Sequence, residues 1–204
     1  MDAAVPSCTF LIEQCYYWQN RLACIIANIY CERTILDPYT TWGYHNNPYN
    51  VQTPCRTHGQ CYETEDDITT FLNNPKTQQE LGAEVNFFAT CSQKVHLGFM
   101  LAGDVPKPFH LEIPPLLSAG IRVLIYAGDA DWICNWYGNK AYAQALEWSG
   151  QTKFNEAEDL PWSVDGEAAG EVRTYEHLTF IRVFGSGHFV PYDRPKSALD
   201  MVNR

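Results

Sequence analysis

Basic residues are scarce in this sequence. Its 204 residues include 14 lysines and arginines against 24 aspartates and glutamates, which gives a formal net charge of −10 at pH 7. A chain of this sign repels the phosphate backbone, so we expect no nucleic-acid partner. No run of about 18 apolar residues occurs either, and we therefore expect no membrane span.

The cysteine spacing lacks the patterns of a metal site. No C-x-x-C pair occurs, and the histidines do not cluster with the cysteines as zinc sites require. We therefore predict no metal and no cofactor. The eight cysteines instead favour disulfide bonds, which form and persist in an oxidising lumen.

The first residues do not have the pattern of a secretion signal. This conflicts with the disulfide bonds that we expect, because such bonds form in an oxidising lumen. Residues 1–6, Met-Asp-Ala-Ala-Val-Pro, contain no basic n-region and no apolar h-region. N-glycosylation offers no further clue, because the sequence has no N-x-S/T acceptor. The simplest resolution is that the chain is a piece of a longer protein.

The composition is that of a globular protein. Hydrophobic residues make up 46% of the chain and charged residues 19%, which excludes a disordered chain. The length is enough for one globular domain with a sizeable core. Aromatic residues reach 14%, a content that suits large cores and clefts for organic ligands.

Most of the cysteines lie in the first 91 residues, and their spacing predicts a helical hairpin. Four of them are spaced by 7, 9 and 7 residues: Cys8, Cys15, Cys24 and Cys31. A hairpin that turns near Asn20 would pair these four in a nested way, although spacing alone permits three connectivities. Cys55 and Cys61 are six residues apart across a glycine-containing turn, which favours a small local bridge.

The hydrophobic pattern changes near residue 120. Before it, the pattern predicts helices near 1–30, 66–74, 75–82, 92–102 and 111–119, with a loop over 32–62. After it, the pattern predicts strands at 121–127, 171–175 and 178–184 and helices at 136–148 and 195–202. The run at 121–127 is almost continuously apolar, as in a strand that is buried on both faces. We thus expect a mostly helical, cysteine-bridged segment over 1–119 and an α/β segment over 120–204.

Candidate catalytic residues follow two of these strands. Asp129 and Asp131 come directly after the strand at 121–127, and His188 follows the last strand after Gly-Ser-Gly. Open α/β sheets place reactive side chains at the carboxyl ends of their strands. In α/β-hydrolases the acid precedes the histidine along the chain, and it fixes the tautomer of the histidine that moves a proton. This order and placement predict a hydrolase.

We assign the acid role to Asp131, because Asp129 lies within the turn and is expected to stabilise it. The serine of such a hydrolase is missing, since G-x-S-x-G occurs nowhere and Ser186 stands only two residues before His188. Cys134 is a conceivable nucleophile three residues after Asp131. It lacks the strand–turn–helix placement of a nucleophile, so we do not assign it that role.

Several longer segments carry a family resemblance. Residues 123–136 read Val-Leu-Ile-Tyr-Ala-Gly-Asp-Ala-Asp-Trp-Ile-Cys-Asn-Trp, and residues 138–140 continue with Gly-Asn-Lys. Residues 182–193 read Arg-Val-Phe-Gly-Ser-Gly-His-Phe-Val-Pro-Tyr-Asp, after Gly-Glu-Ala-Ala-Gly-Glu-Val at 166–172. These segments, with cysteines 15, 24 and 31 and the stretch 82–91, resemble the serine carboxypeptidases, above all their fungal vacuolar branch.

The resemblance implies a fold and an activity. The chain would be the C-terminal portion of an α/β-hydrolase, with a disulfide-bridged helical cap insertion over 1–119 and the last core strands over 120–204. The activity would be that of a serine-type carboxypeptidase, which releases C-terminal amino acids from peptides. Asp131 would be the catalytic acid and His188 the catalytic base. The full-length family member would reside in a vacuolar or lysosome-like lumen or be secreted.

The resemblance also implies further residue roles. Cys134 would line the substrate cleft as the family's free thiol, and Phe189 would contact substrate beside the histidine. The implied disulfides are Cys8–Cys31, Cys15–Cys24 and Cys55–Cys61. Cys91 would pair with a cysteine far upstream that this sequence lacks.

The missing parts leave an alternative open. The serine, the oxyanion hole and the carboxylate-recognising residues of the family all precede the matched region, so we expect this isolated chain to be inactive. The missing N-terminal half of the hydrolase is then a candidate partner. The alternative is a non-catalytic paralogue or peptide-binding fragment that uses the cap and cleft to hold a peptide.

Overall fold

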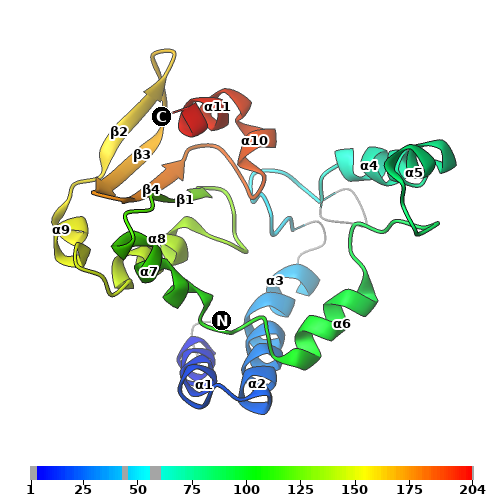
Figure 1. Ribbon diagram of the computed structural model, residues 1–204, viewed down its shortest axis with the longest axis horizontal. Helices are drawn as coiled ribbons and strands as arrows, with labels where there is room; N and C mark the ends of the chain where they lie inside the picture. The colour runs from blue at the N-terminus through cyan, green and yellow to red at the C-terminus, as the bar shows by residue number, and fades with distance from the viewer. Residues whose placement is uncertain (1–3, 43–45, 56–60, 204) are drawn as a thin grey trace. The chain divides into compact units, whose positions relative to one another are not determined.

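The chain folds into two compact units. The structure, a computed structural model, describes residues 4–42, 46–55 and 61–203 (Figure 1). One unit comprises Met1–Asn46 and Pro54–Lys107, and the other comprises Asn47–Thr53 and Pro108–Arg204. We call them the helical unit and the sheet unit and describe each by itself.

The helical unit contains no strand among its described residues. Its helices are α1 (Val5–Trp18), α2 (Arg21–Cys31), η1 (Glu32–Leu36), α3 (Asp37–Trp42), α4 (Thr64–Leu72), α5 (Pro75–Leu81) and α6 (Gln93–Ala102). The turn between α1 and α2 falls at Asn20, whose side chain accepts a hydrogen bond from the backbone N–H of Ala23 and caps α2.

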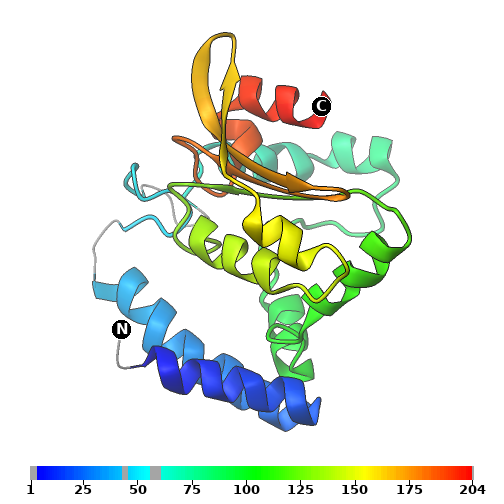
Figure 2. The same ribbon diagram turned by 90° about the vertical axis from the view of Figure 1, so that its left-hand side faces the viewer.

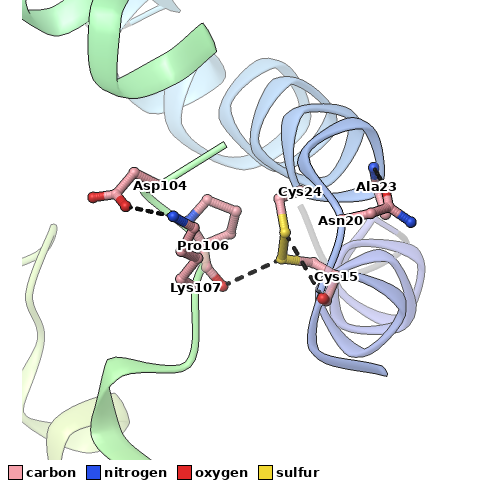
Figure 3. The surroundings of a disulfide bond; sticks show 7 residues. All are labelled: Cys15, Asn20, Ala23, Cys24, Asp104, Pro106 and Lys107. Carbon is pink, nitrogen blue, oxygen red and sulfur yellow. Dashed lines mark hydrogen bonds and ion pairs between the residues drawn. A yellow bond between two sulfur atoms is a disulfide. The ribbon is translucent and has the colours of Figure 1, made fainter. Parts of the chain in front are cut away.

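Disulfide bonds hold the α1–α2 hairpin together. Cys8 is bonded to Cys31 and Cys15 to Cys24, which is the nested arrangement. The Cys15–Cys24 bridge is buried, and Figure 3 shows it beside Pro106, whose carbonyl oxygen lies 3.8 Å from the Cys15 sulfur. A third bridge, Cys55–Cys61, belongs to the same unit.

Removing the buried bridge should destabilise the helical unit measurably. The bridge links two residues nine positions apart and so lowers the conformational entropy of the unfolded chain. Replacing Cys15 and Cys24 together by serine should therefore cost about 2–4 kcal/mol of unfolding free energy. The serine hydroxyls would also be placed in a site that excludes water. Urea unfolding followed by circular dichroism measures the loss. The matched control is Cys55→Ser with Cys61→Ser, where both cysteines are half-buried; an equal or larger loss in this control would contradict the argument.

The helices after Cys31 correct the prediction of a loop over 32–62. Residues Glu32–Trp42 are helical, first as a π-helical turn and then as α3. An ion pair of 3.1 Å between Arg33 and Asp37 stabilises this stretch, and the Thr34 hydroxyl donates to the Tyr30 carbonyl. Pro38 is the second residue of α3 and directly follows the π-helical turn, where the regular i→i−4 bonding is already interrupted. The prediction of a loop relied on the proline, asparagine and tyrosine content of 32–62, and it is wrong for Glu32–Trp42.

The sheet unit is built on four strands in the order β1-β4-β3-β2. They are β1 (Val123–Gly128), β2 (Leu160–Val164), β3 (Glu167–Tyr175) and β4 (Leu178–Val183). β1 pairs with β4 in parallel, whereas β4–β3 and β3–β2 are antiparallel. The sequence pattern missed β2 because Pro161 and the exposed Leu160 break the alternation that marks a strand.

Helices cover both faces of this sheet, as Figure 2 shows for α8 and α9 on one side and α11 on the other. The helical elements are η2 (Phe109–Glu112), α7 (Ile113–Ser118), α8 (Trp136–Ala145), α9 (Gln151–Glu156), α10 (Val190–Asp193) and α11 (Pro195–Asn203). One core cluster joins α7, α8 and α9 to the sheet around Phe154 and Phe180. The other joins α10 and α11 to the opposite face around Trp162 and Met201.

Strand β1 differs from the prediction that both its faces are buried. Ile125 and Ala127 are buried, but Leu124 and Tyr126 on the other face are 41% and 43% exposed. Within the described part of the chain, β1 pairs on one edge only, with β4. No helix in the described ranges is long and apolar enough to cross a membrane.

Candidate active site

The register of the two parallel strands brings the predicted acid and base together. Gly128 at the end of β1 stands opposite Val183 at the end of β4, so the loops that follow leave the sheet at the same level. The loop after β1 carries Asp131, and the loop after β4 carries His188. Residues 57 positions apart in the sequence thus come into contact.

Asp131 and His188 form a hydrogen-bonded pair. The His188 ring nitrogen Nδ1 lies 2.8 Å from Asp131 Oδ2. Asp131 is buried, and its other oxygen accepts a hydrogen bond of 3.1 Å from the backbone N–H of Cys134. The His188 side chain remains 34% exposed. The acid is therefore fixed in place, while the imidazole is accessible to a reacting group.

Asp129 has a different set of partners. Its Oδ1 accepts a hydrogen bond of 2.7 Å from the backbone N–H of Gly185, and its Oδ2 lies 3.7 Å from the Arg182 guanidinium. The side chain thus joins the loop after β1 to the loop after β4. Asp129 stabilises the turn, and Asp131 is the aspartate that contacts the histidine.

The two loops approach each other so closely that only glycine fits at position 128. A Cβ atom on Gly128 would lie 2.3 Å from the carbonyl oxygens of both Ser186 and Gly187. Backbone hydrogen bonds hold this contact, including one of 2.8 Å from the Ala130 N–H to the Ser186 carbonyl. Gly128 therefore sets the spacing of the two loops.

Gly128→Ala should push the two loops apart. We expect a loss of about 2–3 kcal/mol in unfolding free energy, because backbone atoms rather than a flexible side chain would have to move. Chemical denaturation followed by tryptophan fluorescence measures it. Gly138→Ala in α8 is the control, since its Cβ would meet nothing closer than 3.5 Å and alanine favours a helix. Equal stability of the two variants would contradict the steric argument.

Two further predicted residues border the pair. The Phe189 ring packs edge-on against the His188 ring, with centroids 5.4 Å apart, and is 38% exposed. Cys134 is exposed and forms none of the three disulfides. Asp131, Cys134 and His188 each offer one ligand atom, all within 4.8 Å of one another, which is a set that could hold a metal ion. Because Asp131 and His188 already engage each other, we assign no metal to this set.

Partial desolvation by the surrounding atoms raises the pKa of the Cys134 thiol, and the nearby Asp131 carboxylate raises it further. A raised pKa leaves less thiolate at neutral pH, so iodoacetamide should alkylate Cys134 more slowly than an unstructured thiol. Asp131→Asn removes the negative charge and should therefore speed alkylation at a fixed pH. Peptide mapping by mass spectrometry over a pH series measures the rate. Asp129→Asn is the control, and an equal acceleration in both variants would contradict the assignment.

A segment that nothing in the sequence marks as functional contacts both loops. Residues Asn47–Thr53 belong to the sheet unit, although the residues on either side of them belong to the helical unit. The backbone carbonyl of Tyr49 accepts a hydrogen bond of 2.7 Å from the His188 N–H. The predicted loop over 32–62 contains this segment, and nothing in its composition indicates a role at the site.

Comparisons with known proteins show which family the sequence resembles. A family model described as serine carboxypeptidase matches residues 1–204. Carboxypeptidase Y of Candida albicans is 45% identical over 201 residues, which cover 98% of this chain and 37% of that protein. Carboxypeptidase Y homolog A of Leptosphaeria maculans is 44% identical over 206 residues, with 100% and 37% covered. The chain thus spans little more than a third of the length of these relatives.

A solved structure shares the fold. The crystal structure of KEX1(DELTA)P, described as a prohormone-processing carboxypeptidase from Saccharomyces cerevisiae, matches with a TM-score of 0.70 at 24% sequence identity. The match covers 85% of this chain and 40% of that one.

Proposed function

Because the chain belongs to the serine carboxypeptidase family, we propose that it supplies the acid and the base of an enzyme that removes C-terminal residues from peptides. The observation that carries the proposal is the 2.8 Å contact between Asp131 Oδ2 and His188 Nδ1 at the ends of two parallel strands. A serine hydrolase needs a carboxylate and an imidazole in this relation.

In the proposed mechanism His188 moves the protons. Its Nε2 takes the proton of a serine hydroxyl as the serine oxygen attacks the scissile carbonyl. It then returns that proton to the leaving amine. In the second half of the reaction it takes a proton from the water that attacks the acyl-enzyme and gives it to the serine oxygen as the acid product leaves. Asp131 keeps the proton of His188 on Nδ1 and stabilises the imidazolium that forms. Cys134 and Phe189, which border the pair, would contact the substrate.

The serine and the oxyanion hole would come from another part of a longer protein. The sequence has no G-x-S-x-G, and the chain covers 37% of its Candida albicans relative. Leu124 and Tyr126 on β1 are exposed, as expected for a strand whose second face is covered by parts of the longer protein. In this proposal residues 120–204 are the last part of an α/β-hydrolase core, and residues 1–119 are mostly its cap insertion.

The same proposal covers location and partners. Disulfide bonds persist in an oxidising lumen, so the longer protein would act in a vacuolar or lysosome-like compartment or be secreted. Its substrates would be peptides, and the missing N-terminal half would be the part with which this chain works.

A graft tests the proposal. The segment of the Candida albicans relative that aligns with this chain would be replaced by residues 1–204. We expect the graft to release C-terminal amino acids from a blocked dipeptide, and the isolated chain to release none. A folded graft without activity would favour the alternative, a non-catalytic paralogue or peptide-binding fragment. Turnover by the isolated chain would contradict the proposal that the serine and the oxyanion hole come from another part of the protein.

A further inference from the structure

Segment Asn47–Thr53, which we call the docked segment, is bonded to the chain on both sides of Asp131. Its Val51 N–H donates to the carbonyl of Ala130 at 2.9 Å. Its Pro48 carbonyl accepts hydrogen bonds from Trp132 and Ile133, at 3.1 Å and 3.0 Å. The residues immediately before and after the acid are therefore held by one short piece of chain.

The docked segment is bonded to the histidine loop as well. The Tyr49 carbonyl accepts from the His188 N–H at 2.7 Å, and the Tyr49 ring packs against the imidazole with centroids 5.4 Å apart. At Gly187 a Cβ atom would lie 2.2 Å from the Tyr49 carbonyl oxygen, so the contact leaves no room for a side chain. One segment thus joins both loops of the candidate active site through its backbone.

Buried asparagines give the docked segment its shape. The side-chain oxygen of Asn47 accepts from the backbone N–H groups of Tyr49 and Asn50, and its amide donates to the Thr53 hydroxyl. The oxygen of Asn50 accepts from the Gln52 N–H. Asn47 and Asn50 are 2% and 6% exposed. Hydrogen bonds of buried polar groups are costly to lose, so this shape is strongly specified.

A carboxylate outside the acid–base pair fixes the docked segment to the histidine loop. Asp193 Oδ2 accepts hydrogen bonds from the Gly187 N–H at 2.6 Å and from the Asn50 amide at 3.2 Å. Gly187 immediately precedes His188. The carboxylate therefore ties together the docked segment, the histidine loop and α10, on which it lies.

We infer that Asn50 and Asp193 are positioning residues, which hold the docked segment so that it sets His188 against Asp131. The inference rests on the proposed function, because the pair it positions is the proposed acid and base. Neither residue touches the reacting groups. Both act through the backbone bonds that the docked segment makes to residues 130–133 and to His188, and Asp193 also acts through its bond to the Gly187 N–H.

Nuclear magnetic resonance of the purified chain tests the inference. Two readouts are used: the low-field proton resonance of an imidazole Nδ1–H bonded to carboxylate, and amide exchange at His188. We expect Asn50→Ala and Asp193→Ala to abolish or broaden the imidazole resonance and to speed exchange at His188 by roughly tenfold or more. Asp193→Asn keeps one accepting oxygen, so we expect a smaller change in both readouts. This milder variant keeps the test valid if an alanine variant fails to fold.

The control removes an asparagine side chain elsewhere in the sheet unit. Asn155 is exposed and donates to the Gln144 carbonyl, away from the pair, so Asn155→Ala should leave both readouts unchanged. If the imidazole resonance survives in Asn50→Ala and Asp193→Ala, or is also lost in Asn155→Ala, the inference is wrong while the proposed function stands. If the unsubstituted chain lacks the resonance, the pair itself is absent, and both fail.

Discussion

His188→Ala should abolish peptide hydrolysis by the graft of this chain into its Candida albicans relative. We expect kcat to fall by roughly 10⁵- to 10⁶-fold, because no other group would take the proton of the attacking serine. His188 is the histidine bonded to a buried carboxylate, with Nδ1 2.8 Å from Asp131 Oδ2. Release of the C-terminal amino acid from a blocked dipeptide measures the loss.

A second histidine of the same unit provides the control. His177 lies in the turn between β3 and β4, at the end of β4 remote from His188, and is half-buried. His177→Ala should leave kcat within a few-fold of the unsubstituted graft. Retention of activity in His188→Ala would show that this histidine is not the base.

Asp131→Asn should cost the graft on the order of 10⁴-fold in kcat. An asparagine keeps the size of the side chain but carries no charge, so it cannot stabilise an imidazolium. Its amide can also donate to Nδ1, which favours the tautomer with the proton on Nε2, where the serine proton must go. The loss should therefore appear in kcat rather than in KM.

Asp129→Asn separates the two aspartates that follow β1. An asparagine at this position can still accept the hydrogen bond from the Gly185 N–H, so kcat should change little. A larger loss in Asp129→Asn than in Asp131→Asn would reverse the assignment of the acid. The two variants together thus test which aspartate faces the histidine during catalysis.

Much of the sheet unit could be predicted from the sequence, because its elements carry strong local patterns. The apolar run that overlaps β1 is followed at once by an aspartate-bearing turn, and β4 is followed by a glycine-flanked histidine. Both strands were therefore identified, although β1 begins two residues later and ends one residue later than predicted, and its second face is exposed in this chain. An apolar run in a sequence indicates that both faces of the strand are covered, but it does not show which part of the protein covers them.

The docked segment could not be predicted, because its role depends on bonds between residues far apart in the sequence. Asn50 and Asp193 are 143 residues apart, and the stretch around Asn50 has neither helical nor strand periodicity. Asparagine, proline and tyrosine in such a stretch indicate a loop, which is correct locally. That this loop bonds to the residues on either side of Asp131 and to His188 itself follows only from the tertiary structure.

Labelling the graft with a serine-directed fluorophosphonate is the most direct test that Asp131 and His188 activate a serine. The label reacts with the nucleophile itself, so the result does not depend on the choice of peptide. Peptide mapping by mass spectrometry would locate the label. We expect rapid, stoichiometric labelling of a single serine in the unsubstituted graft, and labelling slower by orders of magnitude in His188→Ala and Asp131→Asn. Equal labelling rates in the three proteins would contradict it.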